Sequence, residues 1–155
     1  MMLGGWNERR VIFGAMNLWT GRRLFLPRRR QRAEDFQAFL RLLRRHYRGW
    51  HPALLLDGDP SHTARGSQEL ARQLGVLLLW LPKRCPELNP MDELWGQAKD
   101  AICANKQYGG IDEQVKRFID HLVALPWWEA LHTAGVHSPH FWLKSVLSKK
   151  FCGPA

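Results

Sequence analysis

Two aspartates in this chain have the surroundings that a metal site needs. Asp57 directly follows the apolar run 53–56, and Asp92 comes three residues after Asn89, with 34 residues between the two acids. Hard oxygen ligands held on rigid elements are what Mg²⁺ needs in a site for phosphoryl transfer. The spacing predicts that Asp57 and Asp92 meet at one sheet edge and hold a divalent metal. Lys99, on the same helical row as Asp92, could then neutralise a phosphate.

Both aspartates also have a purely structural interpretation. An acid in the first turn of a helix caps backbone N–H groups and complements the helix dipole, which would account for Asp92. Asp57 could simply begin the loop that Pro60 continues. Spacing alone does not decide between the two interpretations.

Hydrophobic patterns predict the elements that position these acids. Residues 53–56 and 76–81 are continuous apolar runs, typical of strands buried on both faces of a parallel sheet. The residues between them have a helical pattern, so 53–81 predicts a strand–helix–strand unit. Asn89 as N-cap and Pro90 at the first position begin a helix over 89–104. Its apolar stripe consists of Met91, Leu94, Trp95, Ala98 and Ile102.

The remaining elements flank this unit. Residues 11–27 predict a hairpin that turns at Thr20 and Gly21. Helices are expected over 111–151, the first with Asp112 as its N-cap and with the apolar stripe Val115, Phe118, Ile119 and Leu122. Between hairpin and first apolar run, an amphipathic helix is predicted from the stripe Phe36, Phe39, Leu40, Leu43 and Tyr47.

Positive charge is concentrated in the first third of the chain. Residues 1–50 hold twelve arginines against three acids and thus account for the whole net charge of +9. Arg28, Arg29 and Arg30 form the densest part, and Arg44 and Arg45 lie on the polar face of the predicted basic helix. Arginine pairs well with phosphate, so this pattern predicts a polyanion partner, most often nucleic acid. A solvated helix face plus a loop is the alternative.

Composition excludes several classes of protein. With 155 residues, 45% of them hydrophobic and 24% charged, the chain predicts one globular domain rather than a disordered one. No apolar run approaches the ~18 residues that a membrane span needs, and no secretory signal is present. Cys85, Cys103 and Cys152 are odd in number and far apart, which disfavours a disulfide framework and a zinc site. We expect a cytoplasmic protein.

The two acidic motifs together resemble a known family. The segments LLLDGDPSH over 54–62 and LPKRCPELNPMDELW over 81–95, followed by Lys99, resemble the second and third acidic motifs of DDE transposases. The resemblance is closest to bacterial insertion-sequence transposases of the mariner superfamily, and it spans about residues 7–151. It implies an α/β fold, with a ribonuclease H-like mixed sheet flanked by helices. The implied activity is DNA cleavage and strand transfer with two divalent ions, Mg²⁺ or Mn²⁺.

The family motifs assign roles to individual residues. Asp57 matches the second catalytic acid and Asp92 the third, whereas Glu93 points ~100° away around the helix. His62 matches a histidine of the second motif, as a support or DNA contact, although local packing would explain it equally well. The family's supporting positions correspond to Asn89 and Trp95, and further DNA contacts are expected from Lys83, Arg84 and Lys99.

One family feature is not found in the sequence. The first catalytic acid lies on a strand upstream of the hairpin, but no aspartate precedes Asp35. We therefore expect a partial catalytic domain over 1–151 that lacks the central first strand. Two interpretations follow: a transposase, active alone or with an upstream fragment that supplies the acid, and a non-catalytic DNA-binding remnant.

The resemblance also implies partners and a location. The partners are transposon ends and target DNA, with a second copy of the chain or an upstream transposase fragment as the protein partner. The location is the cytoplasm, in association with the nucleoid. A resolvase-like nuclease is a third interpretation, which the motif over 88–95 disfavours.

Overall fold

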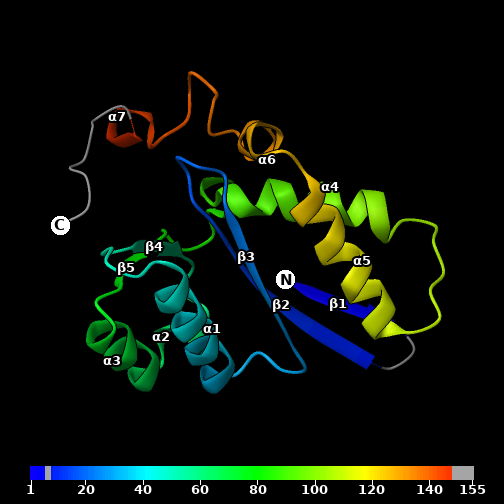
Figure 1. The fold of residues 1–155 in the computed structure, drawn as a ribbon, viewed down its shortest axis with the longest axis horizontal. Helices are drawn as coiled ribbons and strands as arrows, with labels where there is room; N and C mark the ends of the chain where they lie inside the picture. Colours follow the sequence, from blue (N-terminus) through cyan, green and yellow to red (C-terminus); the bar gives the residue numbers. More distant parts are fainter. Residues whose placement is uncertain (6–7, 148–155) are drawn as a thin grey trace. The chain divides into compact units, whose positions relative to one another are not determined.

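The computed structural model describes residues 1–5 and 8–147 (Figure 1). The expected C-terminal boundary at residue 151 and Cys152 lie outside these residues. Although the length predicts one domain, the chain divides into two compact units. Of the described residues, the first unit combines those up to Arg29 with 90–147, and the second comprises Arg30–Asn89.

The first unit contains a three-stranded antiparallel sheet. Strands β1 (Met2–Gly5), β2 (Glu8–Met16) and β3 (Arg23–Arg28) follow one another in the order β1-β2-β3. The hairpin expected over 11–27 corresponds to β2 and β3, in which Gly14 pairs with Phe25. Strand β1 was not expected, because its residues show no strand periodicity. It forms by pairing with β2, where Met2 lies opposite Val11.

Helices pack on this sheet through the predicted apolar stripes. Helix α4 (Pro90–Ile102) buries Met91, Leu94 and Ala98, and α5 (Ile111–Ala124) packs against α4 and the sheet. Two shorter helices follow, α6 (Trp127–Thr133) and α7 (Lys144–Leu147). The core of this unit includes Leu3, Ile12, Leu94, Phe118, Leu122, Ala130 and Leu131.

The predicted N-cap of α5 is wrong. The helix begins at Ile111 and its N-cap is Gly110, so Asp112 lies inside the first turn. The Asp112 carboxylate instead accepts a hydrogen bond of 2.9 Å from Nε of Arg10 on β2. The Asp112 side chain, which the local pattern assigned to capping, thus forms a tertiary ion pair with Arg10.

The second unit contains the predicted strand–helix–strand segment. Helix α1 (Ala33–His46) precedes β4 (Ala53–Leu56), and β5 (Leu77–Trp80) runs parallel to β4 with Leu56 opposite Trp80. A short 3-10 helix, η1 (Pro86–Leu88), ends the unit. Helix α1 buries Phe36, Phe39, Leu40 and Leu43 of its expected stripe. The fifth expected residue, Tyr47, is instead the half-buried C-cap.

Between β4 and β5 the structure has two helices where the pattern predicts one. They are α2 (Pro60–Thr63) and α3 (Arg65–Gln73), and the chain between them is extended at Ala64. The Ala64 carbonyl accepts hydrogen bonds from the N–H groups of Ser67 and Gln68. A new helix start therefore satisfies the backbone at the break.

Among the described residues the antiparallel and parallel strands form two separate sheets, and no strand pairs with members of both. One expectation about the strands is wrong in detail. Strand β5 is not buried on both faces, since Leu77 is 59% exposed and Leu79 40%. An apolar run leads to double burial only where elements cover both faces, and local sequence does not determine that.

No helix among residues 1–5 and 8–147 is long and apolar enough to cross a membrane.

We predict that Gly14→Ala destabilises the first unit. A Cβ at Gly14 would lie 2.7 Å from Cζ2 of Trp95 and 2.9 Å from Cδ1 of Phe25, closer than carbon atoms approach. Overpacking of this kind costs about 1–3 kcal/mol of unfolding free energy, which thermal denaturation would measure.

Gly96→Ala on α4 is the matched control. A Cβ there meets nothing within 4 Å, so this variant should gain up to about 1 kcal/mol from helix propensity. Equal effects of the two substitutions would contradict the packing at Gly14.

Candidate active site

Asp57 lies immediately after the carboxyl end of β4, as the sequence predicts. Its side chain is 66% exposed. The carboxylate oxygen Oδ1 accepts from the backbone N–H of Asp59 at 3.3 Å and lies 2.9 Å from Nδ1 of His62. No partner is found for Oδ2 among the described residues. One oxygen of Asp57 is therefore held by the protein and the other is open to a ligand.

His62 is both a packing residue and a support for Asp57. Its ring lies 4.4 Å from that of Phe36, between centroids, and the side chain is only 16% exposed. The Nδ1 atom also lies 3.2 Å from the Asp57 carbonyl oxygen. The two interpretations left open for His62 therefore hold together, because the packing on α1 orients the ring that contacts Asp57.

Asp59 carries the structural role in this loop. Its Oδ1 accepts from the N–H of Ser61 at 2.8 Å and from the Ser61 hydroxyl at 2.5 Å, and its Oδ2 accepts from Nε2 of Gln31 at 2.8 Å. Asp59 is thus the N-cap of α2, with Pro60 at the first helical position. With both oxygens occupied, Asp59 leaves the ligand-binding role to Asp57.

The support from Asp59, Ser61 and Gln31 was missed by sequence reasoning. Aspartate before proline is a helix-start signal, so the role of Asp59 could have been found. The hydrogen bond from Gln31 to this loop could not have been found, because it depends on how α1 packs. Buried Ser67 completes the loop by donating its hydroxyl to the Ser61 carbonyl at 2.8 Å.

Asp92 lies in the first turn of α4, exposed to solvent. Asn89 directly precedes this helix, as predicted. Gly96 and Lys99, further along α4, are also exposed. Trp95 instead faces inward, with ring centroids 5.7 Å from Phe25 and 6.0 Å from Phe118. Trp95 therefore positions α4, and with it Asp92, on the sheet.

The two predicted metal ligands belong to different compact units, with Asp57 in the second and Asp92 in the first. Their joint metal site therefore stays a prediction. Within the described part of the chain, no group of three or more His, Cys, Asp or Glu side chains is placed to hold a metal ion.

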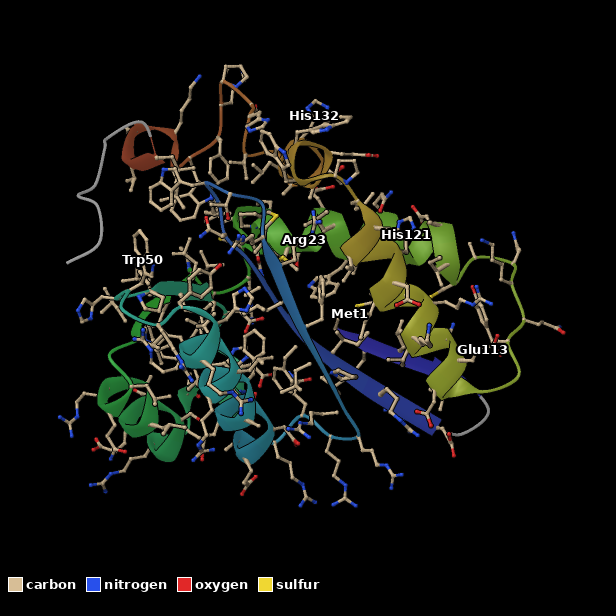
Figure 2. The ribbon with its side chains drawn as sticks, in the orientation of Figure 1. Met1, Arg23, Trp50, Glu113, His121 and His132 are labelled. Carbon is tan, nitrogen blue, oxygen red and sulfur yellow. The ribbon has the colours of Figure 1, made fainter. Side chains whose placement is uncertain are left out.

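Several arginines are used inside the protein. Arg23, labelled in Figure 2, donates from Nη2 to the Leu125 carbonyl at 2.6 Å, and burial lowers its pKa. Arg44, predicted to contact nucleic acid, donates from Nη1 to the Leu74 carbonyl at 3.1 Å and from Nη2 to the Tyr47 carbonyl. Arg44 therefore ties the end of α1 to the end of α3, and its guanidinium is largely committed.

Most of the other residues predicted to contact nucleic acid are exposed to solvent, and Arg28 is the exception. Arg28, the last residue of β3, is half-buried and has other interactions. The exposed basic side chains are those of Arg29, Arg30, Arg45, Lys83, Arg84 and Lys99. These residues retain the charge that a phosphate backbone would contact.

Comparison with known proteins identifies the family. The model of the DDE superfamily endonuclease family matches residues 3–114. The chain therefore belongs to the DDE superfamily endonucleases. A search of curated proteins found no match.

Solved structures show the same fold. The Mos1 transposase catalytic domain with raltegravir and Mg is 23% identical, with a TM-score of 0.69, covering 98% of this chain and 82% of that one. A crystal structure of the catalytic domain of the Mos1 mariner transposase is 22% identical, with a TM-score of 0.67 and coverage of 86% and 73%. The Mos1 mariner paired-end complex with Mn is 22% identical, with a TM-score of 0.67, and matches 97% of this chain but 47% of that one. The chain thus shares the fold of the Mos1 catalytic domain, the ribonuclease H-like fold that the sequence predicts.

We predict that Asp59 and Asp57 differ sharply in their effect on stability. Asp59→Ala removes the cap of α2 and the bond to Gln31, which should cost about 1–2 kcal/mol of unfolding free energy. Asp59→Asn should lose much less, since asparagine also caps helices well. Urea denaturation would measure both changes.

Asp57→Asn serves as the comparison. Its exposed carboxylate should change stability by no more than about 0.5 kcal/mol. A loss as large as that of Asp59→Ala would instead assign Asp57 a structural role.

Proposed function

We propose that this chain supplies the catalytic domain of a DNA transposase, which cleaves DNA and transfers the cut strand with the help of divalent metal ions. The observation that carries the proposal is Asp57, an exposed acid with one supported and one open oxygen at the end of β4, in a DDE superfamily endonuclease. The Mos1 structures bound to Mg and Mn add support by likeness of fold.

The residues present fit part of a metal site. Asp57 and Asp92 offer the hard, exposed carboxylate oxygens that Mg²⁺ and Mn²⁺ prefer. Since no three donors come together among the described residues, a further ligand must be water or come from another segment or chain. When bound, the ions would supply the Lewis acidity that DNA cleavage needs.

The chain's own residues prepare this site. His62 holds one oxygen of Asp57, which leaves the other directed to a ligand. Trp95 sets the position of the helix that carries Asp92. Asn89 directly precedes that helix and would cap its first turn. The exposed cations Lys83, Arg84 and Lys99, together with the arginines of the first third, would hold the DNA backbone by charge-assisted hydrogen bonds.

The proposed partners are transposon ends and target DNA, bound in the cytoplasm at the nucleoid. An upstream transposase fragment or a second copy of the chain would supply the further acid. The free edge of β4 supports a fragment, because β4 pairs only with β5 among the described residues. Unpaired strand edges accept an added strand readily.

We predict that the chain nicks supercoiled plasmid in Mn²⁺ and that Asp57→Asn and Asp92→Asn each reduce nicking. Losing one group that stabilises developing charge lowers a rate by about 100-fold or more. Gel electrophoresis of the plasmid measures the reaction. Asp100→Asn, an exposed acid further along α4, is the matched control and should nick normally.

Metal binding gives an independent readout. Mn²⁺ should raise the thermal stability of the chain, because a ligand that binds only the folded state stabilises it. Asp57→Ala should abolish this rise. Nicking that persists in both aspartate variants, or a metal-induced rise that survives Asp57→Ala, would reject the proposed roles.

The second candidate function is DNA binding without catalysis. It is favoured by the exposed arginines together with the absence of a three-donor metal cluster within the described residues. A folded chain that binds DNA in a salt-dependent way but shows no nicking, with binding intact in Asp92→Ala, would select this function.

A further inference from the structure

A basic and aromatic pocket of roughly 400 Å³ lies in the second unit, away from the acidic loop that carries Asp57 and Asp59. It is lined by Arg44, Arg45, Arg48, Gly49, Trp50 and His51. These residues belong to the last turns of α1 and to the segment that leads into β4. The pocket therefore borders the amino end of β4, whereas Asp57 follows its carboxyl end.

Internal hydrogen bonds fix one side of this pocket. The bonds from Arg44 to the carbonyls of Leu74 and Tyr47 join the ends of α3 and α1. Gly49 then turns the chain with a φ of +78°, a conformation that side chains rarely adopt. The turn ends α1 and leads directly into Trp50, whose N–H donates to the Tyr47 carbonyl at 3.2 Å.

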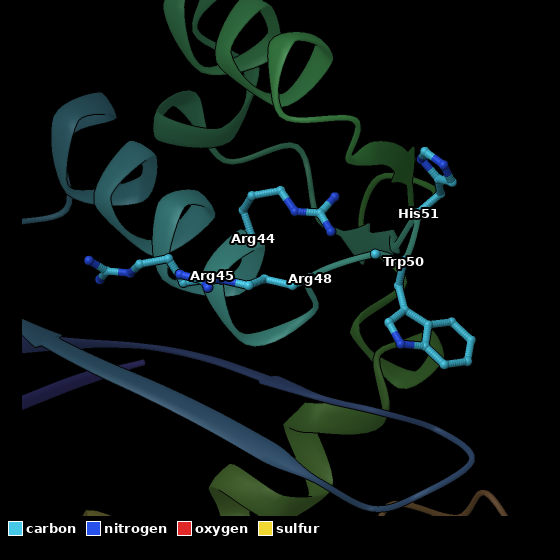
Figure 3. A pocket seen from close by; sticks show the side chains of 6 residues that line it. Arg44, Arg45, Arg48, Trp50 and His51 are labelled. Carbon is cyan, nitrogen blue, oxygen red and sulfur yellow. The ribbon is translucent and has the colours of Figure 1, made fainter. Parts of the chain in front are cut away.

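Within the described part of the chain, the side chains of Arg45, Arg48, Trp50 and His51 make no hydrogen bond or ion pair. Trp50 is 50% exposed, and Arg45, Arg48 and His51 are exposed as well. Figure 3 shows Arg44 and Arg45 on the last turn of α1 and Arg48 just beyond its end, with the side chains of Arg45 and Arg48 extending to one side and the rings of Trp50 and His51 on the segment that leads into β4. An exposed aromatic ring and several cations that line one pocket together suit a ligand with a flat ring and negative charge.

We propose that this pocket binds an unpaired nucleotide of a DNA strand, with the base stacked on Trp50 and the flanking phosphates held by Arg45 and Arg48. Stacking platforms combined with cationic grooves are how proteins hold single strands. Only an unpaired base exposes a face to the indole, because a duplex keeps its bases stacked. The inference rests on the proposed function, action on DNA. It adds that the bound strand is unpaired where it meets this pocket.

The position of the pocket fits a strand that also reaches Asp57. Asp57 comes six residues after His51 along β4, a span of at most about 20 Å at 3.3 Å per residue step. A DNA strand that rises about 3.4 Å per nucleotide covers this span in about six nucleotides. The pocket would thus hold unpaired DNA a few nucleotides from the proposed cleavage point.

Binding of labelled DNA in EDTA tests the inference without any catalysis. The probes are a fluorescein-labelled oligothymidylate and a duplex of the same length, followed by fluorescence anisotropy. Trp50→Ala should weaken oligothymidylate binding at least about fivefold, the lower end of the effect of base stacking, and leave duplex binding nearly unchanged. Trp50→Phe should restore most of the loss.

The arginines are tested through salt dependence. Arg45→Ala combined with Arg48→Ala should lower the slope of log affinity against log salt by about two for the oligothymidylate. Trp128→Ala, which removes a ring of similar exposure in the other unit, and Arg65→Ala, an exposed arginine of α3, are the matched controls. Circular dichroism checks that each variant is folded.

The outcomes separate this inference from the proposed function. Equal weakening of single-strand and duplex binding by Trp50→Ala, or no weakening of either, overturns the stacking role even if the plasmid is nicked. A selective loss of oligothymidylate binding supports the pocket even if the chain proves unable to nick.

Discussion

The packing of the Trp95 indole directly against Gly14 determines how α4 lies on the antiparallel sheet. The indole meets Phe25 on β3 and Phe118 on α5, so one side chain joins three elements of the first unit. A residue larger than glycine at position 14 would displace it. Because Asp92 lies one turn before Trp95 on the same helix, the packing of Trp95 in the core also determines where Asp92 lies on this unit.

In the acidic loop of the second unit, Asp59 has a structural role and Asp57 is the candidate metal ligand. Asp59 uses both oxygens for hydrogen bonds that cap α2 and connect to Gln31. Asp57 makes few bonds and keeps most of its surface in water. A carboxylate that already satisfies helix N–H groups would lose those bonds on taking a metal. The separation of roles therefore lets Asp57 act as a ligand while the loop keeps its shape.

The arginines show a similar division. Arg10, Arg23 and Arg44 make ion pairs or hydrogen bonds with parts of their own unit, and Arg23 is held by the carbonyl of Leu125. Their charges are partly balanced inside the protein, so they attract a polyanion less than the formal charge of +9 suggests. The exposed arginines carry the remaining charge. Among them, Arg45 and Arg48 lie beside an exposed tryptophan, which makes this place chemically different from a solvated basic face.

The amino-acid sequence by itself determined the apolar stripes of α1, α4 and α5, the strands β4 and β5, the placement of Asp57 after β4 and of Asp92 in the first turn of α4, and the family motifs. All of these depend on residues close together in the chain, where periodicity and capping act directly. Tertiary structure decided the pairing of β1, the break at Ala64, the ion pair of Asp112 with Arg10 and the exposure of β5. Each depends on which distant segment covers a face or satisfies a backbone group, and local sequence carries no record of that.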